Sequence, residues 1–212
     1  MKTVYPHSLT VVLSAALAGL ALSTVIAEQP AESKSPDFPH FEVIPPPPFV
    51  IAEPADAGTN AVAAAAIQWL NDNRIAAVFA DRNATDAAVR CRVRFHHAPA
   101  AERDYKSAFE IKPTAEGAPP LVVIYTAALA APGVAPEQYQ RRVNKETLRG
   151  VLLALGIEKC VFFLCNLYEH EDTDALDRKS TNPCPPCQGR VEEWLRNNDL
   201  MPRTVVREPE QP

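Results

Sequence analysis

Four of the five cysteines in this 212-residue chain form two close pairs in its C-terminal quarter. Cys160 and Cys165 have the spacing C-x4-C, and Cys184 and Cys187 have the spacing C-x2-C. Two close pairs of thiolates suit a tetrahedral zinc ion, because each pair can bind the same metal. The spacing therefore favours a structural zinc site made of these four residues.

Two other interpretations of the four cysteines stay open. In an oxidising compartment they would form two disulfides, either within the pairs or between them. Cys184-Pro185-Pro186-Cys187 also has the form of a redox pair, although no preceding strand of a βαβ unit is visible. Cys91 stands apart on an alternating segment and is interpreted as a small buried apolar residue.

Residues 149–187 resemble the archaemetzincins, a family of small zinc metallopeptidases with the signature HExxHxxGxxHC-x4-C-x-M and a later CxxC. Gly156 and the four cysteines match this signature, and the acidic segment 171–179 is similar to the one before the family's CxxC. The resemblance implies an α+β, zincin-like fold. It also implies a mixed sheet, a long helix before Gly156 and a C-terminal zinc subsite made of the four cysteines.

The family's catalytic residues are missing at the matching positions. Its three zinc-binding histidines correspond to Arg149, Leu153 and Lys159, its general-base glutamate to Gly150, and its turn methionine to Leu167. Arginine and leucine offer a metal no lone pair, and lysine does so only after losing its proton. We therefore expect a pseudoenzyme with one structural zinc ion and no catalytic one.

Two alternatives to the pseudoenzyme remain. An active zinc metallopeptidase or aminopeptidase would need other ligands, such as His96, His97 or His170, although neighbouring strand residues point to opposite faces. The second alternative is a small secreted disulfide-bonded protein, which would share only its architecture with the archaemetzincins. For the pseudoenzyme we expect a binding role, in which Arg149 and Lys159 place positive charge where the catalytic zinc would lie and accept a carboxylate of a peptide or protein.

The elements that must position these residues follow from the hydrophobic pattern. Residues 89–95 alternate between apolar and basic side chains, which predicts a strand with one solvent-exposed, basic face. Residues 121–126 are a continuous apolar run and predict a buried central strand. Asn60 is expected to cap a helix that runs to residue 71. A helix is expected from Pro136 to Leu155, where Gly156 ends it, and a last helix over residues 190–197.

The chain before this domain has two parts. Met1–Ala27 has one lysine and then an apolar run, which is typical of a cleaved signal peptide, and an uncleaved anchor is the alternative. Residues 28–58 contain Pro45-Pro46-Pro47-Pro48 and predict an extended arm without a central strand, whose apolar side chains pack in part on the domain. The domain is expected over residues 59–200, followed by a polar tail over 201–212.

The composition and net charge of the chain further narrow the range of possible functions. The hydrophobic fraction of 47% is ordinary for a globular protein, and the net charge of −5 argues against a nucleic-acid partner. Asn83-Ala84-Thr85 is a glycosylation sequon, which agrees with a secretory route. We expect an extracellular monomer that does not bind membranes after cleavage.

Overall fold

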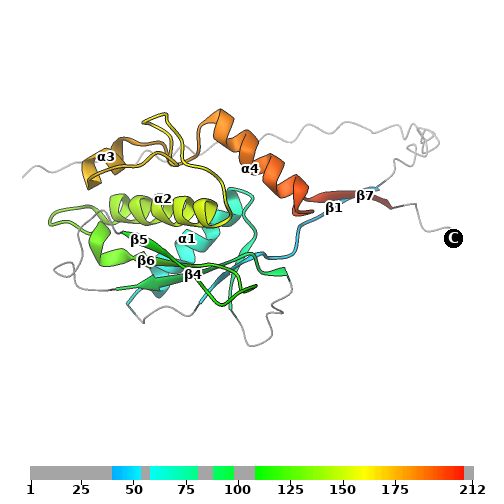
Figure 1. Cartoon of the computed structure of the whole chain (residues 1–212), viewed down its shortest axis with the longest axis horizontal. Coiled ribbons are helices and arrows are strands. Elements are labelled where there is room, and N and C mark those ends of the chain that lie inside the picture. Colours follow the sequence, from blue (N-terminus) through cyan, green and yellow to red (C-terminus); the bar gives the residue numbers. More distant parts are fainter. Residues whose placement is uncertain (1–39, 54–57, 81–87, 98–107, 208–212) are drawn as a thin grey trace, which may run out of the picture. The chain divides into compact units, whose positions relative to one another are not determined.

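The computed structural model describes residues 40–53, 58–80, 88–97 and 108–207 (Figure 1). The predicted signal peptide, Met1–Ala27, and the predicted glycosylation site, Asn83, lie outside the described residues. None of the described helices is long and apolar enough to cross a membrane.

A five-stranded mixed sheet forms the centre of the fold, in the order β3-β2-β4-β6-β5. β2 pairs in parallel with β3 and β4, β4 pairs in parallel with β6, and β5 is an antiparallel edge strand. The strands are β2 (Val50–Ala52), β3 (Ala77–Phe79), β4 (Cys91–His96), β5 (Phe109–Lys112) and β6 (Leu121–Tyr125). The predicted mixed sheet is therefore confirmed.

The two predicted strands lie at the centre of this sheet. On β4, Cys91, Val93 and Phe95 are buried, whereas Arg94 is exposed and its Nε donates to Glu53 Oε2 over 2.6 Å. On β6, residues 122–125 are all buried, as expected for a strand covered on both faces. The basic face of β4 is thus partly neutralised by an acidic residue at the end of β2.

Four α-helices accompany the sheet in the described part of the chain: α1 (Asn60–Asp72), α2 (Pro136–Ala154), α3 (Thr173–Arg178) and α4 (Pro185–Asn197). A 3-10 turn, η4 (Thr126–Leu129), follows β6. In Figure 1, α2 lies between the sheet and the segment that carries α3. Gly156 follows α2 with a φ of 87°, which ends the helix as predicted because a left-handed residue cannot continue it.

Two helix starts differ from the sequence prediction. Thr59 is the N-cap of α1, so Asn60 is already inside the helix. α4 begins at Pro185 and not near residue 190, with Cys184 as its N-cap. Proline suits a first helical position because the missing N–H would have no helical partner there.

The prediction that residues 28–58 contain no central strand is wrong. Val50–Ala52 form β2 inside the sheet, and Phe49 is fully buried, so the domain starts well before residue 59. The proline run ends at Pro48, and the apolar residues after it have free N–H groups for pairing. Part of the expected packing of the arm is therefore confirmed at Phe49.

The remainder of the arm and the predicted polar tail form a second sheet. β1 (His40–Ile44) pairs antiparallel with β7 (Arg203–Arg207), and Phe41 and Val43 are exposed on it. The sequence separation of these strands is too large for a local turn signal. The described part of the tail is thus a strand.

α2 approaches the sheet closely at Gly150. A Cβ added there would lie 2.8 Å from Val122 Cγ1 and 3.3 Å from Phe109 Cδ2. Val122 belongs to β6 and Phe109 to β5, so any larger residue would push the helix away from two strands. The absence of a side chain at Gly150 is therefore a packing requirement.

We expect Gly150→Ala to destabilise the protein by about 1–3 kcal/mol, because the added methyl group overpacks the core. Gly189→Ala is the matched control, since Gly189 is also inside a helix but has nothing within 4 Å of an added Cβ. The control should be neutral or stabilising by about 1 kcal/mol. Urea unfolding of both variants measures the difference, and an equal gain in both would contradict the close packing.

Candidate functional site

The four cysteines predicted as metal ligands converge at one point. Their sulfur atoms all lie within 4.8 Å of one another. The Sγ–Sγ distance is 3.7 Å for Cys160–Cys184, 3.8 Å for Cys165–Cys187 and 3.4 Å for Cys184–Cys187. A tetrahedral zinc ion with Zn–S bonds of about 2.3 Å separates its sulfur ligands by about 3.8 Å. The arrangement therefore fits a metal site with four cysteine ligands.

Disulfides do not form in this structure. All five cysteines are free, and a disulfide would require a sulfur–sulfur distance of about 2.05 Å. Cys91 is fully buried on β4, as predicted, and burial raises its pKa to about 12.

Nitrogen donors from nearby backbone and side chains point at the sulfur atoms. They are Phe162 N to Cys160 Sγ (3.3 Å), Cys184 N to Cys165 Sγ (3.2 Å) and Arg190 Nη2 to Cys187 Sγ (3.0 Å). Burial opposes ionisation of Cys160, but the Phe162 N–H and the neighbouring sulfurs outweigh it and lower its pKa to about 7. Burial raises the pKa of Cys187 to about 12. All four sulfurs can thus ionise together only when a cation offsets their charge.

The loop between the first two cysteines is apolar and exposed. Val161 is 95% exposed and Phe163 63% exposed, and the Phe162 and Phe163 rings meet edge to face. Phe163 and Leu164 extend to the mouth of a cleft.

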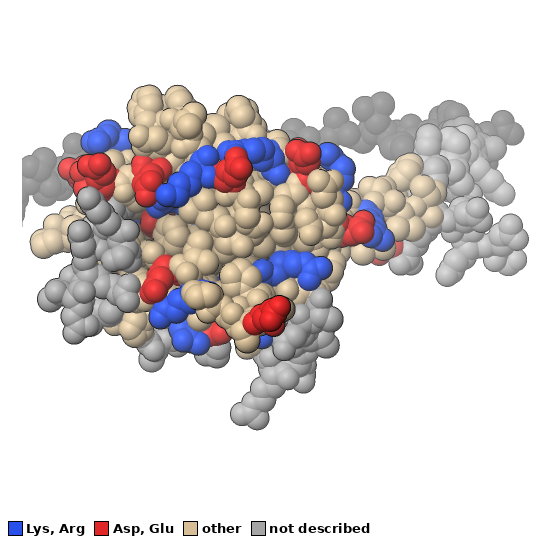
Figure 2. Space-filling view, in the orientation of Figure 1, with Lys and Arg blue, Asp and Glu red and all other residues tan. Residues whose placement is uncertain are grey.

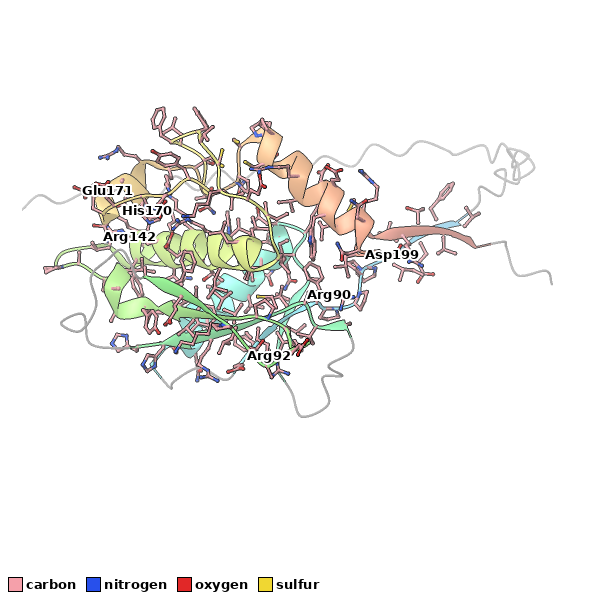
Figure 3. The ribbon with its side chains drawn as sticks, viewed as in Figure 1. Arg90, Arg92, Arg142, His170, Glu171 and Asp199 are labelled. Atoms are coloured by element: carbon pink, nitrogen blue, oxygen red, sulfur yellow. The ribbon has the colours of Figure 1, made fainter. Side chains whose placement is uncertain are left out.

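This cleft has a volume of about 590 Å³ and lies between α2 and residues 163–179. Figure 3 shows His170 in the space between α2 and α3. The lining combines aromatic, apolar and charged side chains: Glu146, Arg149, Phe163, Leu164, Tyr168, Glu169, His170, Glu171, Asp172, Ala175, Arg178 and Lys179.

Buried charges form the floor of the cleft. Arg149 Nη1 lies 3.6 Å from Glu146 Oε2, and His170 Nε2 lies 3.4 Å from Glu146 Oε1. Lys179 Nζ lies 2.6 Å from His170 Nδ1 and also donates to the carbonyl oxygen of Tyr168. Two cations, one carboxylate and one imidazole therefore share the site.

Burial is the largest cause of the pKa shifts of Glu146, His170 and Lys179 on the cleft floor. It raises the pKa of Glu146, against the attraction of Arg149 and Lys179. Burial, together with the positive charges of Lys179 and Arg149, lowers the pKa of His170 to about 3. Burial and Arg149 lower the pKa of Lys179 to about 8. At neutral pH His170 is uncharged and Lys179 is mainly cationic.

Residues 160–179 cover α2, and further buried charges attach this covering segment to the helix. Arg142 donates to Asp177 through Nε (2.9 Å) and Nη2 (2.6 Å), and this pairing lowers the pKa of Asp177. Lys145 Nζ donates to the carbonyl oxygens of Leu176 (2.9 Å) and Lys179 (2.8 Å). These bonds hold α3 and Lys179 against the helix.

The positions that the sequence resemblance matches to the family's catalytic residues have different surroundings in the structure. Arg149 lines the cleft, Gly150 faces the sheet, Leu153 is half-buried and Leu167 is fully buried. Lys159 is exposed and lies 3.1 Å from Glu169 Oε2 on the surface.

The predicted pairing of Arg149 with Lys159 in one pocket is therefore wrong. The second buried cation of the cleft is Lys179, which sequence reasoning missed. Nothing in the sequence distinguishes Lys179 from an ordinary charged loop residue. Only the packing of the segment against α2 places it beside His170.

The histidines considered as alternative ligands do not form a cluster of potential metal ligands in the described part of the chain. The His96 ring contacts the Tyr125 ring, and His97 Nδ1 lies 3.3 Å from Thr126 Oγ1. Over the described residues, the four cysteines are the one group of three or more potential ligands close enough to hold a metal ion.

Comparison with known proteins places the fold. No protein-family model matches the sequence, and no curated protein matches it either. The solved archaemetzincin of Methanopyrus kandleri superimposes with a TM-score of 0.52 and 14% identity, covering 70% of this chain and 96% of that chain. The chain has the archaemetzincin fold. The predicted zincin-like architecture is thereby confirmed.

A second solved structure is similar to this chain. It is the zinc-dependent peptidase of Methanocorpusculum labreanum, with a TM-score of 0.49 and 13% identity, covering 67% of this chain and 99% of that chain.

We expect Cys184→Ser to lower the bound metal and to loosen residues 160–187, because one of the four sulfur ligands is lost. Cys91→Ala is the control, since Cys91 lies on β4, outside the group. It should retain the metal content of the wild type even if it costs stability. Metal analysis of both purified variants tests this, and equal metal content in both would contradict the site.

The buried imidazole should make the protein sensitive to acid. The pKa of His170 is about 3 in the folded chain and about 6.5 in the unfolded chain. Between these values only the unfolded chain binds this proton, so the free energy of unfolding falls as the pH falls from 6.5. We expect His170→Asn to reduce this slope in urea unfolding between pH 7 and pH 5, with bound metal monitored. Equal slopes would contradict the burial of His170.

Proposed function

We propose that this chain is a secreted, catalytically inactive relative of the archaemetzincins that acts by binding. In this proposal Cys160, Cys165, Cys184 and Cys187 hold one structural zinc ion. The cleft beside α2 receives the ligand, and its chemistry is that of recognition without bond cleavage.

The four-cysteine group supports zinc as the metal. Four sulfur donors within 4.8 Å of one another, with three pairs at 3.4–3.8 Å, suit zinc and leave no open coordination position for a substrate. A closed site of this kind stabilises the fold. Its role here is to join the two ends of the segment that covers α2.

The observation that carries the proposal is the charge of the cleft floor. Arg149 and Lys179 are both buried there, and two positive charges oppose the binding of a divalent cation in the same space. At Gly150, where the family has its general base, a side chain would collide with Val122. Restoring the chemistry would thus require new packing as well as new ligands.

Secretion rests on the first 27 residues, whose single lysine and apolar run are typical of a signal peptide. In an oxidising compartment, zinc would also protect the four thiolates, since metal-bound sulfur is unavailable for a disulfide.

Elemental analysis and a peptidase assay on the purified protein test the proposal together. We expect at most one zinc ion per chain, released by thiol reagents. We expect no chelator-sensitive cleavage of peptide or amino-acid amide substrates. Two zinc ions per chain, or cleavage that a chelator abolishes, would overturn the proposed inactivity.

A further inference from the structure

Two buried polar atoms on the floor of the cleft lack hydrogen-bond partners among the described residues. They are Arg149 Nε and Glu146 Oε1. The side chains are 9% and 2% exposed. Glu146 Oε1 lies 3.4 Å from His170 Nε2 but has no hydrogen bond to it. Buried polar atoms are nearly always paired, so an unpaired donor and an unpaired acceptor on one cleft floor indicate that a ligand or water completes them.

The two side chains form an ion pair, but it leaves Arg149 Nε and Glu146 Oε1 without a hydrogen bond. Arg149 Nη1 lies 3.6 Å from Glu146 Oε2, which is longer than a hydrogen bond. The guanidinium is held in place because its Cζ lies 5.1 Å from the centre of the Phe109 ring. The site therefore offers a fixed donor group for a carboxylate beside an acceptor for an ammonium group.

The charges around the cleft are mixed. Its lining has three basic residues, Arg149, Arg178 and Lys179, and four acidic residues, Glu146, Glu169, Glu171 and Asp172. In Figure 2 positive and negative side chains likewise alternate over the upper part of the visible face, without an extended patch of one sign. This balance suits a zwitterion better than a simple anion or cation.

The rim of the cleft adds apolar surface. Phe163, Leu164 and Tyr168 line it, and they are 63%, 37% and 36% exposed. An apolar group of a bound ligand would cover part of these side chains and gain the usual free energy of burial.

We propose that the cleft binds a free α-amino acid with an apolar side chain. The carboxylate accepts hydrogen bonds from Arg149, the ammonium group donates to Glu146, and the side chain packs on Phe163 and Leu164. This inference rests on the proposed function in one respect, because it requires that no catalytic metal ion occupies the cleft.

Isothermal titration calorimetry on the purified protein, with leucine as the probe, tests the proposal. N-acetylleucine lacks the ammonium group and leucinamide lacks the carboxylate. Leucine should bind saturably, and each blocked analogue should bind about tenfold or more weakly, because one charge-assisted pairing is lost. Glycylleucine, with its ammonium group far from its carboxylate, should also bind weakly.

Variants locate the binding site. Arg149→Met and Glu146→Gln should each weaken leucine binding by about tenfold or more. Arg74→Met is the matched control, because Arg74 is an exposed cation that pairs with Glu192, and neither residue lines the cleft. It should bind leucine as the wild type does. The wild-type comparison of leucine with its blocked analogues decides the question even if Arg149→Met fails to fold.

Three results would overturn the proposal. They are no saturable binding of leucine, equal binding of the blocked analogues, and preference for N-acetylleucine and glycylleucine, which would indicate a site for peptide carboxyl ends. Zinc content and hydrolysis of leucinamide are measured on the same sample. Cleavage of leucinamide would remove the proposed inactivity, whereas loss of leucine binding alone would remove only this inference.

Discussion

The burial of α2 on both sides is the constraint on which the rest of the structure depends. One side packs on the sheet so closely that residue 150 has no room for a side chain. The other side carries Arg142, Lys145, Glu146 and Arg149, and residues 160–179 cover it. Charges buried without partners are costly. The covering segment must therefore supply partners, and for Arg142 and Lys145 these are Asp177 and the carbonyl groups of residues 176 and 179.

The four-cysteine group holds this cover in place. Cys160 and Cys165 lie at the start of the covering segment and Cys184 and Cys187 follow it, yet all four sulfurs lie within 4.8 Å of one another. A metal ion there closes a loop whose free ends would otherwise cost entropy to bring together. The same loop carries His170 and Lys179 into the cleft. The metal site and the cleft are thus parts of one arrangement, although no metal ligand lines the cleft.

Much of the fold could be predicted from local patterns. Alternation on β4, the apolar run of β6 and the proline and glycine at the ends of α2 are signals that act within a few residues. β2 was missed because only three paired residues follow a proline run. The pairing of β1 with β7 was missed because it joins residues more than 150 positions apart. No local pattern carries that information.

The candidate site, like the fold, could be predicted from the sequence only in part. By itself, the sequence determined the four-cysteine group, because the spacing of ligands along the chain limits which residues can reach one metal ion. It also predicts that Arg149, Gly150 and Leu153 stand where the family it resembles has catalytic residues. Only the tertiary structure decided that Lys179 and not Lys159 enters the cleft, and that Glu146 and His170 meet there. The physical reason is that burial and charge pairing depend on which segments pack together. The residues of the covering segment that contact the buried charges of α2 lie too far from them along the chain for local patterns to reveal the pairing.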